Sequence, residues 1–229
     1  MNFGGIIYEW YKKNRRDLPW RRTSDPYLVW ISEVILQQTR VSQGLKYYNN
    51  LVKVFPDVTS LAEAEEDRVL KLWQGLGYYS RARNMHRAAK DLVEKHRGKM
   101  PKTYDGLLEM KGVGTYTASA IASICFGEEI AVVDGNVARV IARLYGVEEA
   151  VNGTAGKRII DSLAAELMAQ SMGKSSGNKA GQYSDPGTHN QAMMEFGALH
   201  CVPVSPSCGK CPWQRGVLPV RPAGLGIFP

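Results

Sequence analysis

Two carboxyl groups of this 229-residue chain stand where an acid could do chemistry. Glu33 is followed by three aliphatic residues, and partly apolar surroundings keep a carboxylic acid protonated near neutral pH because burial disfavours its charged form. Asp134 follows the apolar segment 131–133 at the expected start of a helix, whose dipole favours an ionised carboxylate. One protonated and one ionised carboxyl group form the pair that hydrolyses sugar bonds. Asp134 on its own could equally be a plain helix cap.

Two glycines, Gly112 and Gly114, flank Val113 in a turn between two predicted helices. Glycine permits backbone angles that are unfavourable for other residues, and it lets the chain approach another backbone closely. The amides at the start of the following helix point outward together and can bind a phosphate, which would anchor a nucleic acid without reading its bases. A glycine pair alone is compatible with an ordinary tight turn, but the helix on either side favours a helix-hairpin-helix motif.

Three of the four cysteines crowd near the C-terminal end of the sequence. Cys201, Cys208 and Cys211 are separated by six and by two residues. In a cytosolic chain such crowding favours a metal site over a disulfide. The fourth, Cys125, lies in an apolar stretch, and we expect it to be a core residue.

The composition is that of a globular protein, with 44% hydrophobic and 22% charged residues. No apolar run is long enough to span a membrane, and the first residues lack the apolar core of a signal peptide. We therefore expect a cytoplasmic protein with no membrane partner. The net charge of +7 and the pI of about 9.2 fit a polyphosphate partner, although a basic solvated surface without one is equally compatible.

The hydrophobic periodicity predicts an all-α chain with no strand and no internal repeat. Ser60 and Glu63 have the pattern of a capping box, and Ser80 is expected to cap the next helix after a glycine-rich turn. Residues 171–187 are rich in Gly, Ser, Lys and Asn, which predicts a surface loop. The predicted helices are 27–54 as one or two helices, 60–73, 81–96, 103–110, 115–126, 137–145, 157–170 and 190–199.

The hairpin glycines, followed downstream by Val133–Asp134–Gly135–Asn136–Val137, resemble the helix-hairpin-helix superfamily of DNA glycosylases. The resemblance extends from about Trp10 to Cys211. It implies an all-α, two-lobed helix-hairpin-helix fold with an essential Asp, here Asp134, and a cysteine-rich cluster loop near the C-terminus.

The same resemblance predicts how the chain divides into lobes. We expect residues 1–20 and 127–217 to form one helical lobe with the cluster loop, and residues 21–126 to form the other lobe with the hairpin. The substrate cleft is expected between them. Residues 218–229 form a tail unlike the family.

Two segments, Trp30–Thr39 and Leu72–Arg81, resemble the adenine-specific glycosylases of the MutY type. The resemblance implies a monofunctional enzyme that removes adenine mispaired with guanine or 8-oxoguanine in double-stranded DNA, and we expect a monomer. Glu33 matches the general acid that protonates the leaving adenine, and Asp134 is expected to stabilise the cationic sugar. The other implied site residues are Gln38 and Tyr78, which wedge the duplex, and Trp20, Arg21, Asn136 and Gln191, which bind the substrate adenine.

Tyr116 bears on the type of reaction. Relatives that also cut the DNA backbone carry a Lys two residues after the second hairpin glycine, and its amine attacks the sugar. Tyr116 occupies that position here, so no Schiff base can form there. The alternatives are an endonuclease III-like glycosylase/lyase and a DNA-binding module without catalysis.

In this superfamily four cysteines hold a [4Fe–4S] cluster, and the resemblance places the first three ligands at Cys201, Cys208 and Cys211. The fourth position is Val217, which cannot ligate iron, so we expect an absent or incomplete cluster. Zinc with His200 as a further ligand is an alternative. A reading-frame shift near Gln214 is a hypothesis for the unusual tail, because it would restore a cysteine. Relatives of this type continue into a second domain that reads 8-oxoguanine, and the sequence ends before it.

Overall fold

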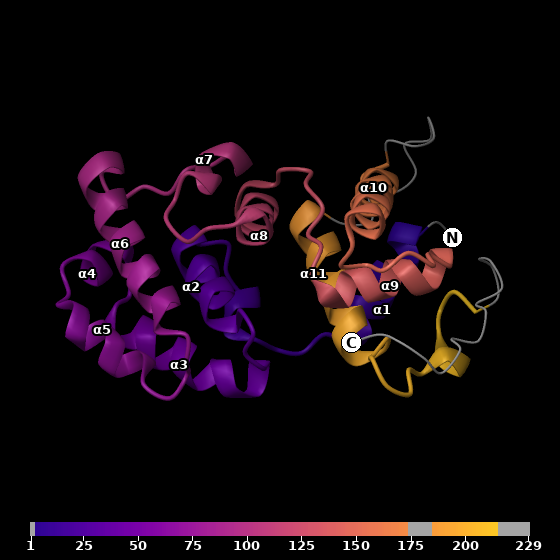
Figure 1. Ribbon diagram of the computed structural model, residues 1–229, viewed down its shortest axis with the longest axis horizontal. Helices are drawn as coiled ribbons and strands as arrows, with labels where there is room; N and C mark the ends of the chain where they lie inside the picture. The colour runs from indigo at the N-terminus through magenta and orange to yellow at the C-terminus, as the bar shows by residue number, and fades with distance from the viewer. Residues whose placement is uncertain (1–2, 174–184, 215–229) are drawn as a thin grey trace. The chain divides into compact units, whose positions relative to one another are not determined.

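The computed structural model describes residues 3–173 and 185–214. Every regular element in these residues is a helix, which confirms the predicted all-α class. The described residues fall into two compact units (Figure 1). Residues 17–128 form one, called here the hairpin unit, and residues 3–16 with the described part of 129–214 form the other, the terminal unit. Among the described helices, none is both long and apolar enough to cross a membrane.

The hairpin unit is built around the helix that carries Glu33. Asp25 caps α2 (Pro26–Leu36) by accepting a hydrogen bond from the Tyr27 amide, and Pro26 suits the first helical position because it lacks an amide hydrogen. Helix α2 is apolar on nearly every side and packs against α3, α6 and α8 (Figure 1). The elements of this unit are η1 (Pro19–Arg21), α2, α3 (Val41–Val54), α4 (Val58–Ala62), α5 (Glu66–Trp73), α6 (Tyr79–His96), α7 (Tyr104–Leu108) and α8 (Thr115–Phe126).

The predicted capping box at Ser60 and Glu63 is wrong. The Asp57 carboxylate accepts from the Ser60 amide at 2.8 Å, and the Ser60 hydroxyl accepts from the Asp57 amide at 3.3 Å. Ser60 is thus the third residue of α4, and Glu63 ends that helix instead of supporting its start. The predicted helix 60–73 is therefore two helices, because the stronger acceptor at Asp57 starts a helix three residues earlier.

The predicted cap of α6 at Ser80 is also wrong. The N-cap is Tyr78, which has a left-handed backbone and makes no side-chain cap bond. Gly75 and Gly77 have positive φ angles of 92° and 79°, and the Trp73 indole donates to the Gly77 carbonyl at 2.9 Å. Because of this tight turn the helix begins at Tyr79, so Ser80 already lies inside it.

The terminal unit contains α1 (Phe3–Asn14), α9 (Gly135–Tyr145), α10 (Thr154–Ser171), α11 (Pro186–Leu199) and η2 (Cys208–Lys210). Helix α11 packs against α9 and α1 (Figure 1). The end of α1 is fixed to α11 through Arg16, whose backbone N and side-chain Nε donate to the fully buried Glu195 carboxylate at 2.8 and 3.0 Å. A buried carboxylate needs such donors, so this pair holds the two helices in register.

Candidate functional site

Asp134 is the N-cap of α9, and both of its carboxylate oxygens accept hydrogen bonds. One oxygen accepts from the Val137 amide at 2.7 Å, and the other accepts from Asn136 Nδ2 at 2.7 Å. The side chain is half-buried. The structure therefore fixes this carboxylate at one place and one orientation. It is a helix cap in geometry, and the same geometry suits a fixed negative charge that acts on a substrate.

The hydrogen bonds continue from Asp134 to the cysteine loop. Asn136 Oδ1 accepts from Arg139 Nη2 at 2.8 Å, and Arg139 Nε donates to the Cys201 carbonyl at 2.7 Å. Arg139 Nη2 also donates to the Gly197 carbonyl at 2.8 Å. A side chain at Gly197 would come within 2.7 Å of Asn136, so the glycine lets α11 cross the start of α9 at close range. Asn136 is thus held from both sides.

Asn190 holds the segment that leads into Asp134. Its Oδ1 accepts from the Val132 amide at 2.9 Å, and its Nδ2 donates to the Ile130 carbonyl at 2.8 Å. The residue is 1% exposed. Its neighbour Gln191, a predicted adenine contact, is half-buried and accepts a hydrogen bond from the Tyr11 hydroxyl at 2.9 Å. Helix α11 therefore orients Gln191 and fixes the approach to Asp134 with consecutive residues.

Glu33 lies on α2 in the hairpin unit and is 7% exposed. The side chain is therefore almost fully withdrawn from solvent, and its role as a protonated acid stays a prediction. The thiol of Cys125 lies close to Glu33. Burial is the main cause that raises the pKa of Cys125 to about 12, and the carboxyl groups of Asp25 and Glu33 add to this increase. Cys125 packs beside the hydrophobic core, as a structural cysteine would.

The hairpin joins α7 to α8 as predicted. Gly112 has a φ of 78°, and a side chain there would come within 2.8 Å of Asn84 on α6, so both the turn and the packing require glycine. Gly114 is different, because its φ is −97° and a side chain would meet nothing within 4 Å. Gly114 is the N-cap of α8 and supplies no side-chain cap, while Val113 between the glycines is buried. The start of α8 therefore has the positive partial charge of a helix dipole and no side-chain cap, an arrangement that favours an anionic ligand.

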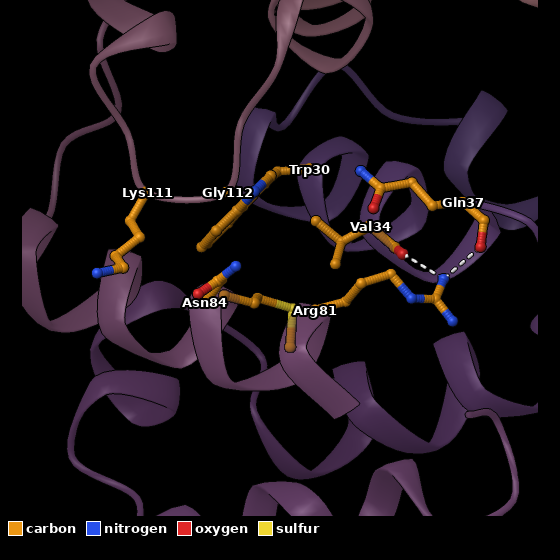
Figure 2. A pocket seen from close by; sticks show the side chains of 8 residues that line it. Trp30, Val34, Gln37, Arg81, Asn84, Lys111 and Gly112 are labelled. Carbon is orange, nitrogen blue, oxygen red and sulfur yellow. Dashed lines mark hydrogen bonds between the residues drawn. The ribbon is translucent and has the colours of Figure 1, made fainter. Parts of the chain in front are cut away.

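The predicted duplex wedges, Gln38 and Tyr78, are both exposed, Tyr78 at 63%. A cavity of about 60 Å³ lies between α2, α6 and the hairpin, and Gln37, the residue before Gln38, lines it (Figure 2). The Trp30 indole Nε1 is buried there without a hydrogen-bond partner among the described residues. The residues that line the cavity are Trp30, Val34, Gln37, Arg81, Asn84, Met85, Lys111 and Gly112.

The remaining predicted contacts lie in the hairpin unit. Trp20 and Arg21 both lie in η1. Trp20 is 6% exposed and packs edge-on against Tyr48 at a centroid distance of 5.1 Å. Arg21 is half-buried. Tyr116 is half-buried in the first turn of α8. The roles of these residues toward adenine stay predictions.

The cysteine loop does not fit a complete [4Fe–4S] site. Cys201 and Cys208 lie near enough to Cys211 to contribute to the raised pKa of its thiol, after burial as the main cause. Yet no three His, Cys, Asp or Glu side chains within 3–173 and 185–214 converge on one point. His200, the alternative zinc ligand, instead stacks on Phe196. Val217, at the fourth ligand position, and the tail lie outside the described residues, but a valine has no ligating atom wherever it lies.

Sequence reasoning missed Arg139, Asn190 and Arg81, which hold site residues in place. Asn190 stands directly before Gln191, but its two backbone contacts lie about sixty residues away along the chain. No local pattern signals such a contact, so only the folded chain can identify these residues.

This chain is similar to known DNA repair proteins in sequence and in fold. Residues 31–166 match the model of the HhH-GPD superfamily, described as base excision DNA repair proteins. The adenine DNA glycosylase of Homo sapiens is 41% identical over 219 residues, which cover 92% of this chain and 38% of the human protein. That of Buchnera aphidicola subsp. Acyrthosiphon pisum is 33% identical over 214 residues, which cover 93% of this chain and 57% of that protein. The chain thus spans roughly two to three fifths of the length of these relatives.

Solved structures that resemble this chain include a glycosylase and an endonuclease III. A thermostable thymine-DNA glycosylase matches with a TM-score of 0.76 and 28% identity over 91% of this chain and 90% of that chain. An endonuclease III–DNA complex matches in fold, with a TM-score of 0.72 and 20% identity over 93% of this chain and 90% of that chain. These similarities confirm the predicted helix-hairpin-helix glycosylase fold, and the curated relatives confirm the resemblance to the adenine-specific branch. Since the family model matches more than half of the chain, this protein belongs to the HhH-GPD superfamily of base excision DNA repair proteins.

Proposed function

We propose that this chain is the catalytic region of an adenine-specific DNA glycosylase, which removes adenine mispaired with guanine or 8-oxoguanine from double-stranded DNA. The observation that carries the proposal is the fixed carboxylate of Asp134 at the start of α9, in a chain whose curated relatives are adenine DNA glycosylases. The buried carboxyl group of Glu33 supplies the second group that the reaction needs.

The chemistry assigns one role to each carboxyl group. Glu33 donates a proton to a ring nitrogen of adenine as the bond between that base and the sugar breaks, and the bonding electrons leave with the base. The sugar carbon becomes cationic, and the fixed negative charge of Asp134 stabilises it. Water then adds to that carbon and gives up a proton. The products are free adenine and an abasic site in DNA.

DNA binding is assigned to the hairpin unit. The N-terminal end of α8, together with Gly112, Val113 and Gly114, binds a backbone phosphate and anchors the duplex. The target base must leave the stack, which costs a few kcal/mol, and intercalation of Gln38 and Tyr78 offsets part of that cost. Trp20, Arg21, Asn136 and Gln191 receive the adenine. A monomeric state and a cytoplasmic location remain predictions.

The absence of an amine at Tyr116 favours a monofunctional enzyme over an endonuclease III-like lyase. The test is a single-turnover assay on an end-labelled duplex with one A:G mismatch, analysed with and without hot alkali. We expect strand cleavage only after alkali. Cleavage without alkali would indicate a lyase, and no cleavage under either condition would indicate a DNA-binding module. Glu33→Gln should abolish adenine release and leave duplex binding nearly intact, because the amide has no carboxylic proton to donate.

For the metal we propose that the chain carries little or no intact [4Fe–4S] cluster. The support is the set of three thiols at Cys201, Cys208 and Cys211 with a valine at the fourth position. Iron and sulfide analysis of anaerobically purified protein tests this. We expect well under four irons per chain and more iron in Val217→Cys, whereas a full, air-stable cluster with Val217 in place would refute the proposal.

A further inference from the structure

Gln38 and Tyr78 share an unusual backbone conformation. Their φ angles are 54° and 49°, in the left-handed region that side-chain-bearing residues rarely adopt. Such a conformation is strained for a residue with a side chain, and it persists only where its surroundings hold it. Gln38 follows the C-terminal end of α2, and Tyr78 directly precedes α6. Two separate turns of the hairpin unit therefore store strain at two exposed residues with the same predicted role.

One side chain, Arg81 on α6, contacts both turns. Its Nη1 donates to the carbonyl oxygens of Val34 at 3.0 Å and Ile35 at 3.1 Å, and also to that of Gln37. Its Nη2 donates to the Gly77 carbonyl at 3.4 Å. Figure 2 shows the Arg81 side chain extended along the cavity toward the main chain at Gln37.

Two of these acceptor carbonyls belong to the residues just before the strained ones. Gln37 directly precedes Gln38, and Gly77 directly precedes Tyr78. The carbonyl of a residue belongs to the same rigid peptide plane as the amide of the next, and rotation of that plane about the next N–Cα bond is the φ angle. A donor that fixes the Gln37 and Gly77 carbonyls therefore restrains φ at Gln38 and Tyr78.

The guanidinium is itself held firmly. It lies over the rings of Trp73 and Tyr78 at 5.4 and 5.5 Å, and the Trp73 indole donates to the same Gly77 carbonyl. Burial lowers the pKa of Arg81 from its ordinary value, and the nearby Tyr78 hydroxyl partly opposes this effect. A planar cation stacked on an aromatic ring and donating to several carbonyls is a use that lysine cannot reproduce.

We propose that Arg81 is a positioning residue that holds the backbones of Gln38 and Tyr78 together, so that the two wedges enter the duplex as one element. The inference rests on the proposed function, since it assigns the wedge role to these two residues. Arg81 acts here through the main chain and stands apart from the chemical step.

The test compares two substrates in single-turnover assays with enzyme in excess. The first substrate is a duplex with an A:G mismatch, whose adenine must be unpaired and unstacked. The second, called here the gapped duplex, places the adenine opposite an abasic site, so that its extrusion costs less. Arg81→Met should slow release from A:G roughly tenfold to a hundredfold, as expected for losing charge-assisted hydrogen bonds, and slow release from the gapped duplex much less. Arg81→Lys should lie between wild type and Arg81→Met.

The matched control is Arg83→Met, which removes a positive charge from the exposed side of the same helix. It should change the ratio of the two rates very little. The ratio of rates is insensitive to the fraction of folded enzyme, so partial misfolding of Arg81→Met does not mimic the expected result.

A double-mutant cycle tests the coupling. If Arg81 acts through both wedges, Arg81→Met should add little to the loss caused by Gln38→Ala together with Tyr78→Ala. An equal slowing of both substrates, or a full additive loss in the triple variant, would overturn the inference while leaving the proposed function intact. A wild-type chain without adenine release would overturn the proposed function itself.

Discussion

The N-termini of α8 and α9 differ in one respect that separates their predicted tasks. Helix α8 starts at Gly114, which makes no side-chain cap bond. Helix α9 starts at Asp134, whose carboxylate accepts from the Val137 amide and from Asn136. Both ends carry the partial positive charge of a helix dipole. An external anion can bind the first, whereas the second already holds an anion that belongs to the protein.

The two starts are also held in different ways. The hairpin before α8 is closed by a local hydrogen bond from the Val113 amide to the Met110 carbonyl, and its Gly112 packs closely on Asn84 of α6. The segment before α9 depends on Asn190, far away along the chain. A site for a phosphate tolerates a local turn, whereas a charge that must meet one sugar carbon needs support from a second helix.

The largest expected effect comes from neutralising the charge at α9. Asp134→Asn should slow adenine release roughly a hundredfold to a thousandfold, because a neutral amide stabilises a cationic sugar poorly. Thermal stability should change little, because Asn and Asp are comparable N-caps. Single-turnover rates and thermal unfolding measure both effects.

The control for this variant is Asp185→Asn, which neutralises the equivalent N-cap of α11. It should leave adenine release unchanged. Wild-type rates for both variants would reduce Asp134 to a plain cap, and the comparison of the two helix starts would fail.

A smaller effect is expected from loosening the approach to α9. Asn190→Asp loses the donor to the Ile130 carbonyl and places a charge in the interior, so adenine release should fall about tenfold or more at neutral pH. At lower pH the protonated acid can again donate to Ile130 and accept from Val132. The rate relative to wild type should therefore rise as the pH falls, and a ratio that is constant with pH would contradict the positioning role of Asn190.

The smallest effect is expected from giving α8 the cap that α9 has. Gly114→Asp should leave thermal stability equal or higher, because an acidic N-cap is favourable and a side chain there meets open space. Duplex affinity should fall about tenfold, since the carboxylate occupies the amides and repels a phosphate. Fluorescence anisotropy with a labelled duplex measures the affinity.

Gly114→Asn separates capping from charge, because it fills the same amides without a negative charge. It should weaken binding less than Gly114→Asp. If both variants bind the duplex like wild type, the hairpin is an ordinary turn between packed helices.

The parts of the fold that the sequence predicted well are those with local signals. Helix α8 spans Thr115–Phe126 as predicted, because Gly114 and Gly127 delimit it, and Gly127 adopts the left-handed conformation typical of a helix end. The capping box failed because Asp57 caps a helix that starts three residues earlier and accepts from the Ser60 amide, and a pattern search does not weigh competing N-caps. Helix α6 starts two residues early because the preceding turn, with left-handed Gly75, Gly77 and Tyr78 and a hydrogen bond from the Trp73 indole to the Gly77 carbonyl, brings the chain into the helix at Tyr79.

The same division applies to the site. The contact between Asp134 and Asn136 was foreseeable, because the two residues are neighbours at a helix start. The contacts of Arg139 with Cys201 and of Asn190 with Val132 join distant segments, and their partners are backbone atoms that carry no residue-specific signal. Pattern reasoning therefore finds residues with distinctive chemistry and misses those that position them.

The Arg81 hydrogen bonds with the two wedge turns are made to main-chain carbonyls, and no side chain of the Gln38 turn takes part in them. Carbonyl oxygens are the same for every amino acid, so the tether does not depend on which side chain stands at position 38. A mutation could therefore replace that side chain with one of different size or hydrogen-bonding capacity and leave the backbone conformation at position 38 unchanged. On the proposed wedge role, this arrangement lets the side chain that enters the duplex vary separately from the backbone that presents it, and it offers a fixed frame in which a designed set of side chains could be compared.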